Sequence, residues 1–144
     1  MYISTILQNK GGVITIVQTE SVQTAAKVLR EKRFGSLMVR DKSGKVAGII
    51  TERDIIRGIA DRGAAVLSFK VEDLMTKEIW SCKPTDLIKD VMQQMTVRRI
   101  RHVPVLDDGA QLVGMISSTD IVKYRLTERA DEVAVLRDLN RARV

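Results

Sequence analysis

Hydrophobic residues recur in this chain with two spacings, one typical of helices and one typical of strands. Between residues 22 and 29 they follow the i, i+3, i+4, i+7 pattern of a helix with one apolar face. The β-branched run 13–17 before it predicts a short strand, and 37–40 and 46–51 predict two strands joined by a turn-rich link. A second helix is expected from Glu52 onward. The predicted order of elements is therefore β-α-β-β-α.

The same pattern returns after a shift of 66 positions. That shift aligns the two halves without a gap and pairs residues of similar type at many ordered places. The matched pairs include Val22 with Ile88, Leu29 with Met95, Arg33 with Arg99, Gly48 with Gly114, and Asp54 with Asp120. One such half leaves an apolar face open. The sequence therefore predicts an α/β (α+β) fold of two β-α-β-β-α repeats packed about a pseudo-two-fold axis, with two equivalent clefts between them.

The repeat divides the chain into five expected segments. They are an N-terminal segment 1–12, a first repeat 13–62, a linker 63–78 with a short helix at 71–75, a second repeat 79–126 and a C-terminal helix 127–144. In the last segment Ala130, Val133, Leu136 and Leu139 recur at three-residue steps. Such a stripe is suited either to covering the core or to pairing with a partner subunit.

Composition narrows the classes of function. The single cysteine, Cys82, excludes an internal disulfide, and the single histidine, His102, argues against a zinc site or a Ser-His-Asp triad. No apolar run approaches the roughly 20 residues that span a bilayer, and residues 1–10 lack a secretory signal, so a cytoplasmic protein is expected. The net charge of +6 indicates an anionic partner, for which nucleic acid, acidic lipid and phosphorylated small molecules all qualify.

A short motif, Thr/Ser-x-x-Asp, occurs at the start of the last predicted helix of each half. It comprises Thr51 and Asp54 in the first half and Ser117 and Asp120 in the second. A carboxylate at a helix N-terminus can accept hydrogen bonds from both hydroxyls of a ribose, and the free N–H groups there suit an anion. The alternative is a capping box that only stabilises the helix. Aspartate is shorter than the usual Glu or Gln of that box, which favours a free carboxylate.

Three stretches carry a resemblance to a known family. Residues 46–56 read VAGIITERDII, residues 98–105 read RRIRHVPV, and residues 112–122 read LVGMISSTDIV. They resemble the CBS-domain family, specifically its free-standing tandem pairs or Bateman modules, over about residues 3–132. The resemblance implies a disc-like dimer whose clefts bind adenosine-containing ligands such as AMP, ATP, NAD(H) or S-adenosylmethionine. It also implies a module that regulates an attached or partner protein.

The resemblance also implies a set of nucleotide-binding residues. One cleft would combine Thr51, Asp54, Arg101, His102 and Thr119, and the other would combine Ser117, Asp120, Ser36 and Arg53. The first half has Gly35 and Ser36 where the second has Arg101 and His102, so the Asp54 cleft is expected to bind phosphate better. Adenine would lie against the first strand of the opposite repeat, which supplies Ile79, Trp80 and Ser81 to the Asp54 cleft and Thr15 at the position matching Ser81.

Several alternatives stay open at this point. Trp80 is also suited to the core, and the basic stretch 98–102 to a solvated helix end. An enzyme would need a base, nucleophile or metal beside Asp54 and Asp120, and the sequence supplies none. A nucleic-acid-binding protein would use 98–102 and the basic tail 137–143.

The favoured hypothesis is a non-catalytic regulatory module without metal or catalytic cofactor. It would bind an adenine nucleotide, AMP before NAD(H) or ATP, and sense energy or redox state as a homodimer acting on an unnamed partner.

Overall fold

The computed structural model describes residues 1–8, 10 and 12–142. Its first half has the predicted order, and the elements are β1 (Thr15–Val17), α2 (Val22–Lys32), β2 (Ser36–Arg40), β3 (Val46–Thr51) and α3 (Glu52–Arg62). The strands form one sheet in the order β1-β2-β3, with β1 parallel and β3 antiparallel to β2. Helix α2 begins where predicted because the Ser21 hydroxyl accepts the Thr24 N–H at 3.1 Å, as an N-cap does.

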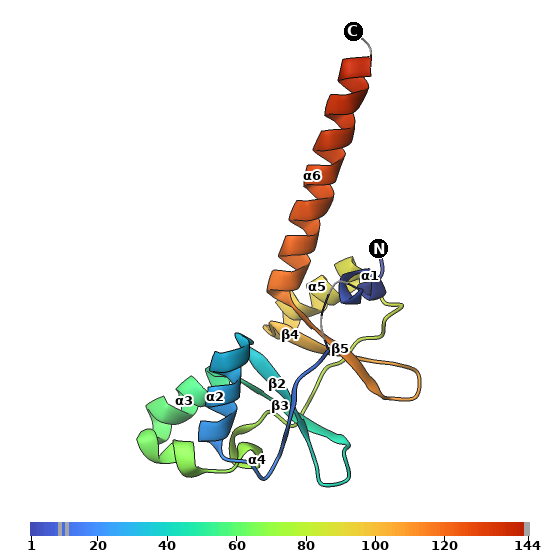
Figure 1. Cartoon of the computed structure of the whole chain (residues 1–144). Helices are drawn as coiled ribbons and strands as arrows, with labels where there is room; N and C mark the ends of the chain where they lie inside the picture. Colours follow the sequence, from blue (N-terminus) through green and yellow to red (C-terminus); the bar gives the residue numbers. More distant parts are fainter. Residues whose placement is uncertain (9, 11, 143–144) are drawn as a thin grey trace.

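The second half repeats this arrangement, with α5 (Ile88–Arg98), β4 (His102–Leu106), β5 (Leu112–Ser117) and α6 (Ser118–Ala142). Its strand register is that of the first half, since His102 pairs with Ser117 as Ser36 pairs with Thr51. Each hairpin also carries an irregularity one residue from the end of its first strand. The mixed α/β fold of two related halves is thus confirmed (Figure 1).

The predicted strand Ile79–Cys82 is wrong, because only Cys82 pairs, in a single parallel bridge to Val105. The chain's two prolines explain the loss. Pro84 replaces Gln18, whose N–H donates to the Arg40 carbonyl at 2.9 Å in the first half. Pro104 replaces Met38, the residue paired with Thr15. Proline has no N–H, so the ladder cannot extend on either side of Cys82.

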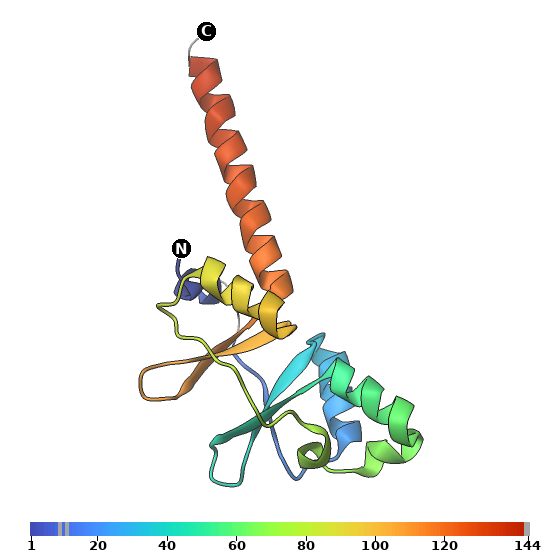
Figure 2. The ribbon, with the colours of Figure 1, turned by 180° about the vertical axis from the view of Figure 1, so that it is seen from behind.

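Each hydrophobic core is completed by a segment that precedes the other half. Helix α1 (Ile3–Leu7) places Ile3 and Ile6 in the second core, beside Ile116. Helix α4 (Val71–Leu74), which follows the 3-10 helix η1 (Ala64–Ser68), places Val71 in the first core. In Figures 1 and 2 the chain accordingly leaves α1, crosses to the other half and returns along the linker. This crossing fixes the halves side by side.

The glycines of the repeated motif allow these segments to lie against the sheets. A Cβ on Gly48 would stand 2.7 Å from the Thr76 carbonyl oxygen and 2.8 Å from the Met75 sulfur. A Cβ on Gly114 would stand 2.4 Å from Leu7. Leu7 and Met75 therefore occupy equivalent places, and only glycine permits the close approach.

The C-terminal helix is longer than predicted. The expected helix 127–144 is the continuation of α6, which runs unbroken from Ser118 to Ala142; residues 143 and 144 lie outside the described part. Most of α6 projects away from both halves (Figure 1), and Val133, Leu136 and Leu139 are 43%, 60% and 55% exposed. The apolar stripe therefore does not cover the core. No described helix is long and apolar enough to cross a membrane.

The role of α1 in the second core can be tested by a truncation of one side chain. Ile3 is fully buried, so Ile3→Ala should lower the free energy of unfolding by about 2–5 kcal/mol, as large-to-small core changes do. Urea denaturation measures this change. The control is Ile56→Ala on α3, where the side chain is 64% exposed and the effect should stay within about 0.5 kcal/mol. Equal effects of the two substitutions would contradict this account of the core.

Candidate functional site

Both Thr/Ser-x-x-Asp motifs form closed capping boxes. The Thr51 N–H donates to Asp54 Oδ2 at 2.9 Å, and the Asp54 N–H donates to Thr51 Oγ1 at 3.2 Å. The corresponding distances for Ser117 and Asp120 are 2.8 and 3.1 Å. The expectation that aspartate is too short to close the box is therefore wrong. The box uses only Oδ2, and Asp54 Oδ1 has no hydrogen-bond partner within the described residues, so the carboxylate retains acceptor capacity.

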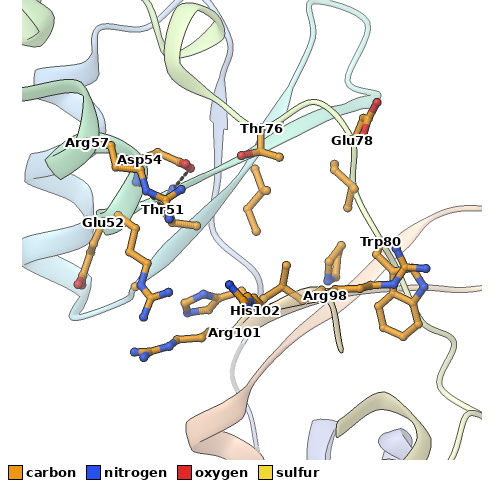
Figure 3. A pocket seen from close by; sticks show the side chains of 17 residues that line it. Thr51, Glu52, Asp54, Arg57, Thr76, Glu78, Trp80, Arg98, Arg101 and His102 are labelled. Atoms are coloured by element: carbon orange, nitrogen blue, oxygen red, sulfur yellow. Dashed lines mark hydrogen bonds between the residues drawn. The ribbon is translucent and has the colours of Figure 1, made fainter. Parts of the chain in front are cut away.

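A cavity of about 680 Å³ lies between the two halves, and we call it the first cleft. One wall is formed by the start of α3, with Thr51 and Asp54. The facing wall is formed by the second half, with Trp80, Arg101 and His102, as Figure 3 shows. The cavity has the size of small-molecule sites and lies where the sequence predicted a cleft.

Five arginines surround the first cleft. Arg53 and Arg57 come from α3, and Arg98, Arg99 and Arg101 come from the end of α5 and the loop after it. Within the described part of the chain none of the five forms a salt bridge, although Glu52, Asp54 and Glu78 also line the cleft. Guanidinium groups that line a cavity without a carboxylate partner are suited to an anion such as phosphate.

A smaller cavity of about 390 Å³, the second cleft, lies at the start of α6. Its lining residues include Ser36, Ser117, Thr119, Asp120, Arg33, Lys123 and Lys10. Here the acidic group is already engaged, because the Lys10 ammonium donates to Asp120 Oδ2 and to the Met115 carbonyl at 2.7 Å. Burial, the largest influence, raises the pKa of Asp120, but Lys10 and the Ser117 hydrogen bonds outweigh it and the pKa is lowered.

The family model of the CBS domain matches the chain twice, at residues 9–61 and 71–127. The chain belongs to the CBS-domain family. It is similar to the mitochondrial CBS domain-containing protein CBSX3 of Arabidopsis thaliana, with 35% identity over 141 residues that cover 91% of this chain and 68% of that protein. The two repeats identified in the sequence are therefore a tandem pair of CBS domains.

Solved structures of CBS pairs share this fold. A CBS-domain containing protein from Agrobacterium tumefaciens superimposes with a TM-score of 0.83 at 38% identity, covering 86% of this chain and 92% of that one. The CBS domain pair of protein MJ0100, in complex with 5′-methylthioadenosine and S-adenosyl-L-methionine, gives 0.78 at 29% identity, covering 89% of this chain and 98% of that one. That second protein thus binds adenosine derivatives.

The structure redistributes two residues of this CBS pair between the clefts. Arg53, expected beside Asp120, lines the first cleft, and Thr119, expected beside Asp54, lines the second. Each residue immediately precedes the aspartate of its own motif, at the first turn of a helix that faces its own cleft. Neither residue therefore lies in the cleft of the other motif, where the resemblance had placed it.

The other expected residues lie as follows. Thr51, Asp54, Ile79, Trp80 and Arg101 line the first cleft, and Ser36, Ser117 and Asp120 line the second. Ser81 lines a third cavity near the two hairpin turns, and Thr15 lines none of the three described cavities. Two important residues were missed. Arg57 lies one helical turn after Arg53, which is a usable signal, whereas no pattern indicated Lys10.

His102 lies between the two clefts and lines both. Its Nε2 would be 3.0 Å from a Cβ at Gly35, so the imidazole packs against the backbone of the other repeat. Burial lowers the pKa of His102, with smaller contributions from Lys10 and Arg101, while Asp120 and Glu52 oppose the shift. At neutral pH the imidazole is therefore an uncharged hydrogen-bonding group shared by the two sites.

Arg33 and Arg99 hold equivalent places with an unusual backbone. Each ends its helix with φ of 56°, in the left-handed region that helix C-termini usually assign to glycine. A non-glycine residue there costs about 1 kcal/mol. Arg33 lines the second cleft and Arg99 the first, so both carry a long cation into a cavity at that cost.

Trp80 and Cys82 have different environments. Trp80 is half-buried, packs against the second core and also lines the first cleft, and the Arg98 guanidinium lies 5.4 Å from its ring centroid. Trp80 is thus part of the core and part of the cavity wall. Cys82 is buried, and burial, together with Asp86, raises the pKa of its thiol to about 12. An unreactive thiol follows.

The single histidine allows a direct test of the interface. The NMR titration midpoint of His102 should lie below the ordinary value of 6.5 because burial disfavours the imidazolium. Since the unfolded chain binds this proton more readily, the free energy of unfolding should fall as the pH drops from about 6.5 through the lowered pKa. Asp120→Asn should lower the midpoint further by removing an anion that raises it. A midpoint above 6.5 would contradict the buried position.

Proposed function

We propose that this CBS pair binds an adenine nucleotide, AMP in the first instance, in the first cleft. The observation that carries the proposal is the pairing of two unlike walls across one cavity. A capped aspartate with a free carboxylate oxygen, Asp54, faces arginines that have no salt-bridge partner among the described residues. The carboxylate can accept hydrogen bonds from ribose hydroxyls, and the arginines can bind a phosphate.

Each part of the nucleotide has a complementary group in the cleft. The Asp54 carboxylate accepts hydrogen bonds from the ribose hydroxyls beside the N-terminus of α3, while the cap keeps it in place. Arg53, Arg57, Arg99 and Arg101, which line the cleft, take the phosphate. The segment of Ile79 and Trp80 receives the adenine. It belongs to no β-strand, so its main-chain N–H and C=O groups remain available for hydrogen bonds to the base.

The charge of the cleft favours a phosphate-bearing ligand over other adenosine derivatives. The MJ0100 pair supports an adenosine ligand in this fold, yet S-adenosylmethionine carries a sulfonium cation near the ribose. Five arginines outnumber the three acids Glu52, Asp54 and Glu78 in the first cleft. A 5′-phosphate therefore gains attraction where a sulfonium meets repulsion.

The proposal describes a regulatory module without catalysis, which works as a homodimer. The exposed apolar residues of α6 support pairing with a second copy, and along 125–141 four arginines are balanced by four acids. That interspersion does not favour the alternative of nucleic-acid binding by the C-terminal tail, of which Arg143 lies outside the described residues. The basic stretch 98–102 contributes to the cleft instead. Ligand bound between the halves would shift their packing, and a partner would read the shift.

Titration calorimetry with AMP tests the assignment. Asp54→Asn should weaken AMP binding about 10- to 100-fold, since it removes the charge from an acceptor worth about 1.5–3 kcal/mol. Asp120→Asn is the matched control in the other motif and should leave AMP affinity within about twofold. Adenosine, which lacks the phosphate, should bind at least 10-fold more weakly than AMP. Parent-like AMP affinity in the Asp54 variant would refute the site.

A second test separates ligand binding from stability at Arg99. Arg99→Gly should raise the free energy of unfolding by about 0.5–1 kcal/mol by relieving the left-handed backbone, yet weaken AMP binding about 10-fold. Arg33→Gly makes the same backbone change in the second cleft. It should give the same gain in stability, measured in urea, without loss of AMP affinity. Equal loss of affinity in both variants would show that Arg99 has no specific role.

A further inference from the structure

We infer that Lys10 closes the second cleft to nucleosides, so that the chain binds one adenine nucleotide rather than two. The inference rests on the proposed function and determines which of two repeated sites is used. The two motifs are equivalent in sequence and in capping geometry, so the motifs themselves do not distinguish the clefts. The difference comes from Lys10, a side chain that lies outside both motifs.

Lys10 takes the place that a ribose would need. Its ammonium donates to Asp120 Oδ2 and, at 2.7 Å, to the carbonyl of Met115 on the adjoining strand. Oδ2 also accepts the Ser117 N–H at 2.8 Å, so this oxygen already has two donors. Asp54 Oδ2 in the first cleft has only the cap donor among the described residues. One oxygen of the Asp120 carboxylate is thus engaged by a lysine, whereas Asp54 accepts no side-chain cation among the described residues.

The side chain at this place differs in charge between the halves, because Lys10 follows Leu7 by three residues and lines the second cleft, whereas Glu78 follows Met75 by three and lines the first. Leu7 against Gly114 and Met75 against Gly48 mark equivalent points, and so do Ile16 and Cys82 in their bridges to Val39 and Val105. From Leu7 to Ile16 there are nine positions, and from Met75 to Cys82 there are seven. The connection from Leu7 to Ile16 is therefore two residues longer than the connection from Met75 to Cys82. Lys10 lies within this longer stretch and reaches the second cleft.

Energetics favours the lysine over a ribose. A neutral hydroxyl is a weaker donor to a carboxylate than an ammonium group, and displacing Lys10 would leave its charge near Arg33 and Lys123, which line the same cleft. The second cleft is also smaller, about 390 Å³ against 680 Å³. Loss of one charge-assisted contact corresponds to about 10- to 100-fold in affinity. We therefore expect the second cleft to stay empty at AMP concentrations that fill the first.

The test counts AMP sites by calorimetry in the parent and in Lys10→Met. The parent should bind one AMP per chain, and Lys10→Met should bind a second, at least 10-fold more tightly than any second site of the parent. Asp120→Asn added to Lys10→Met should abolish that second site. Lys10→Arg keeps a cation at the carboxylate and Lys123→Met removes a charge elsewhere in the cleft, so both should retain one site. Circular dichroism melts check that each variant is folded.

The outcomes separate this inference from the proposed function. Two equal sites in the parent, or one site in folded Lys10→Met, would overturn the role of Lys10 and leave AMP binding in the first cleft intact. If the parent bound no AMP while Lys10→Met bound one through Asp120, the first-cleft proposal would fail and the role of Lys10 would stand. No binding in either protein would overturn both.

Discussion

The exchange of core-completing segments between the halves is the constraint on which the rest of this structure depends. Ile3 and Ile6 belong by sequence to the first half yet lie in the second core, and Val71 of the linker lies in the first. Neither β-α-β-β-α unit buries its apolar face with its own residues alone. Because each core recruits a segment that flanks the other repeat, two chain connections run between the halves and hold them side by side. The clefts lie between these two connected halves.

The helix N-termini that line these clefts stabilise the fold, and in the proposed function they also bind the ligand. Thr51 and Asp54 satisfy backbone N–H groups at the start of α3 through Oγ1 and Oδ2. The cap does not compete with a ligand, since a carboxylate has further lone pairs and its position is fixed beforehand. The costs of the site lie elsewhere. They are the unpaired arginines and the left-handed backbone at Arg99, neither of which the fold itself requires.

Sequence reasoning predicted the repeat, the element order and the two motifs, because these depend on local periodicity and on residues close in the chain. It failed where the outcome depended on a backbone N–H that proline lacks, or on segments distant in sequence. The strand at Ile79–Cys82 was expected because it matches the run 13–17 of the first half, but Pro84 and Pro104 remove its hydrogen bonds. From the resemblance, Arg53 was assigned to the Asp120 cleft and Thr119 to the Asp54 cleft. In the structure each residue lines the same cleft as the aspartate that follows it in the sequence. The exchange of α1 and α4 had no local signal at all.

Duplication alone would produce two equal sites, so the asymmetry of this CBS pair must come from positions where the halves no longer match. Two kinds of difference contribute. Arg101 and His102 replace Gly35 and Ser36 within the repeat, which adds charge to the first cleft and puts the shared imidazole at the interface. Lys10 donates to Asp120 in the second cleft, whereas Glu78 holds the matching place in the first. Both changes act in the same direction. In the function proposed for this chain, ligand occupies one cleft, so the response would come from one side of a symmetric scaffold.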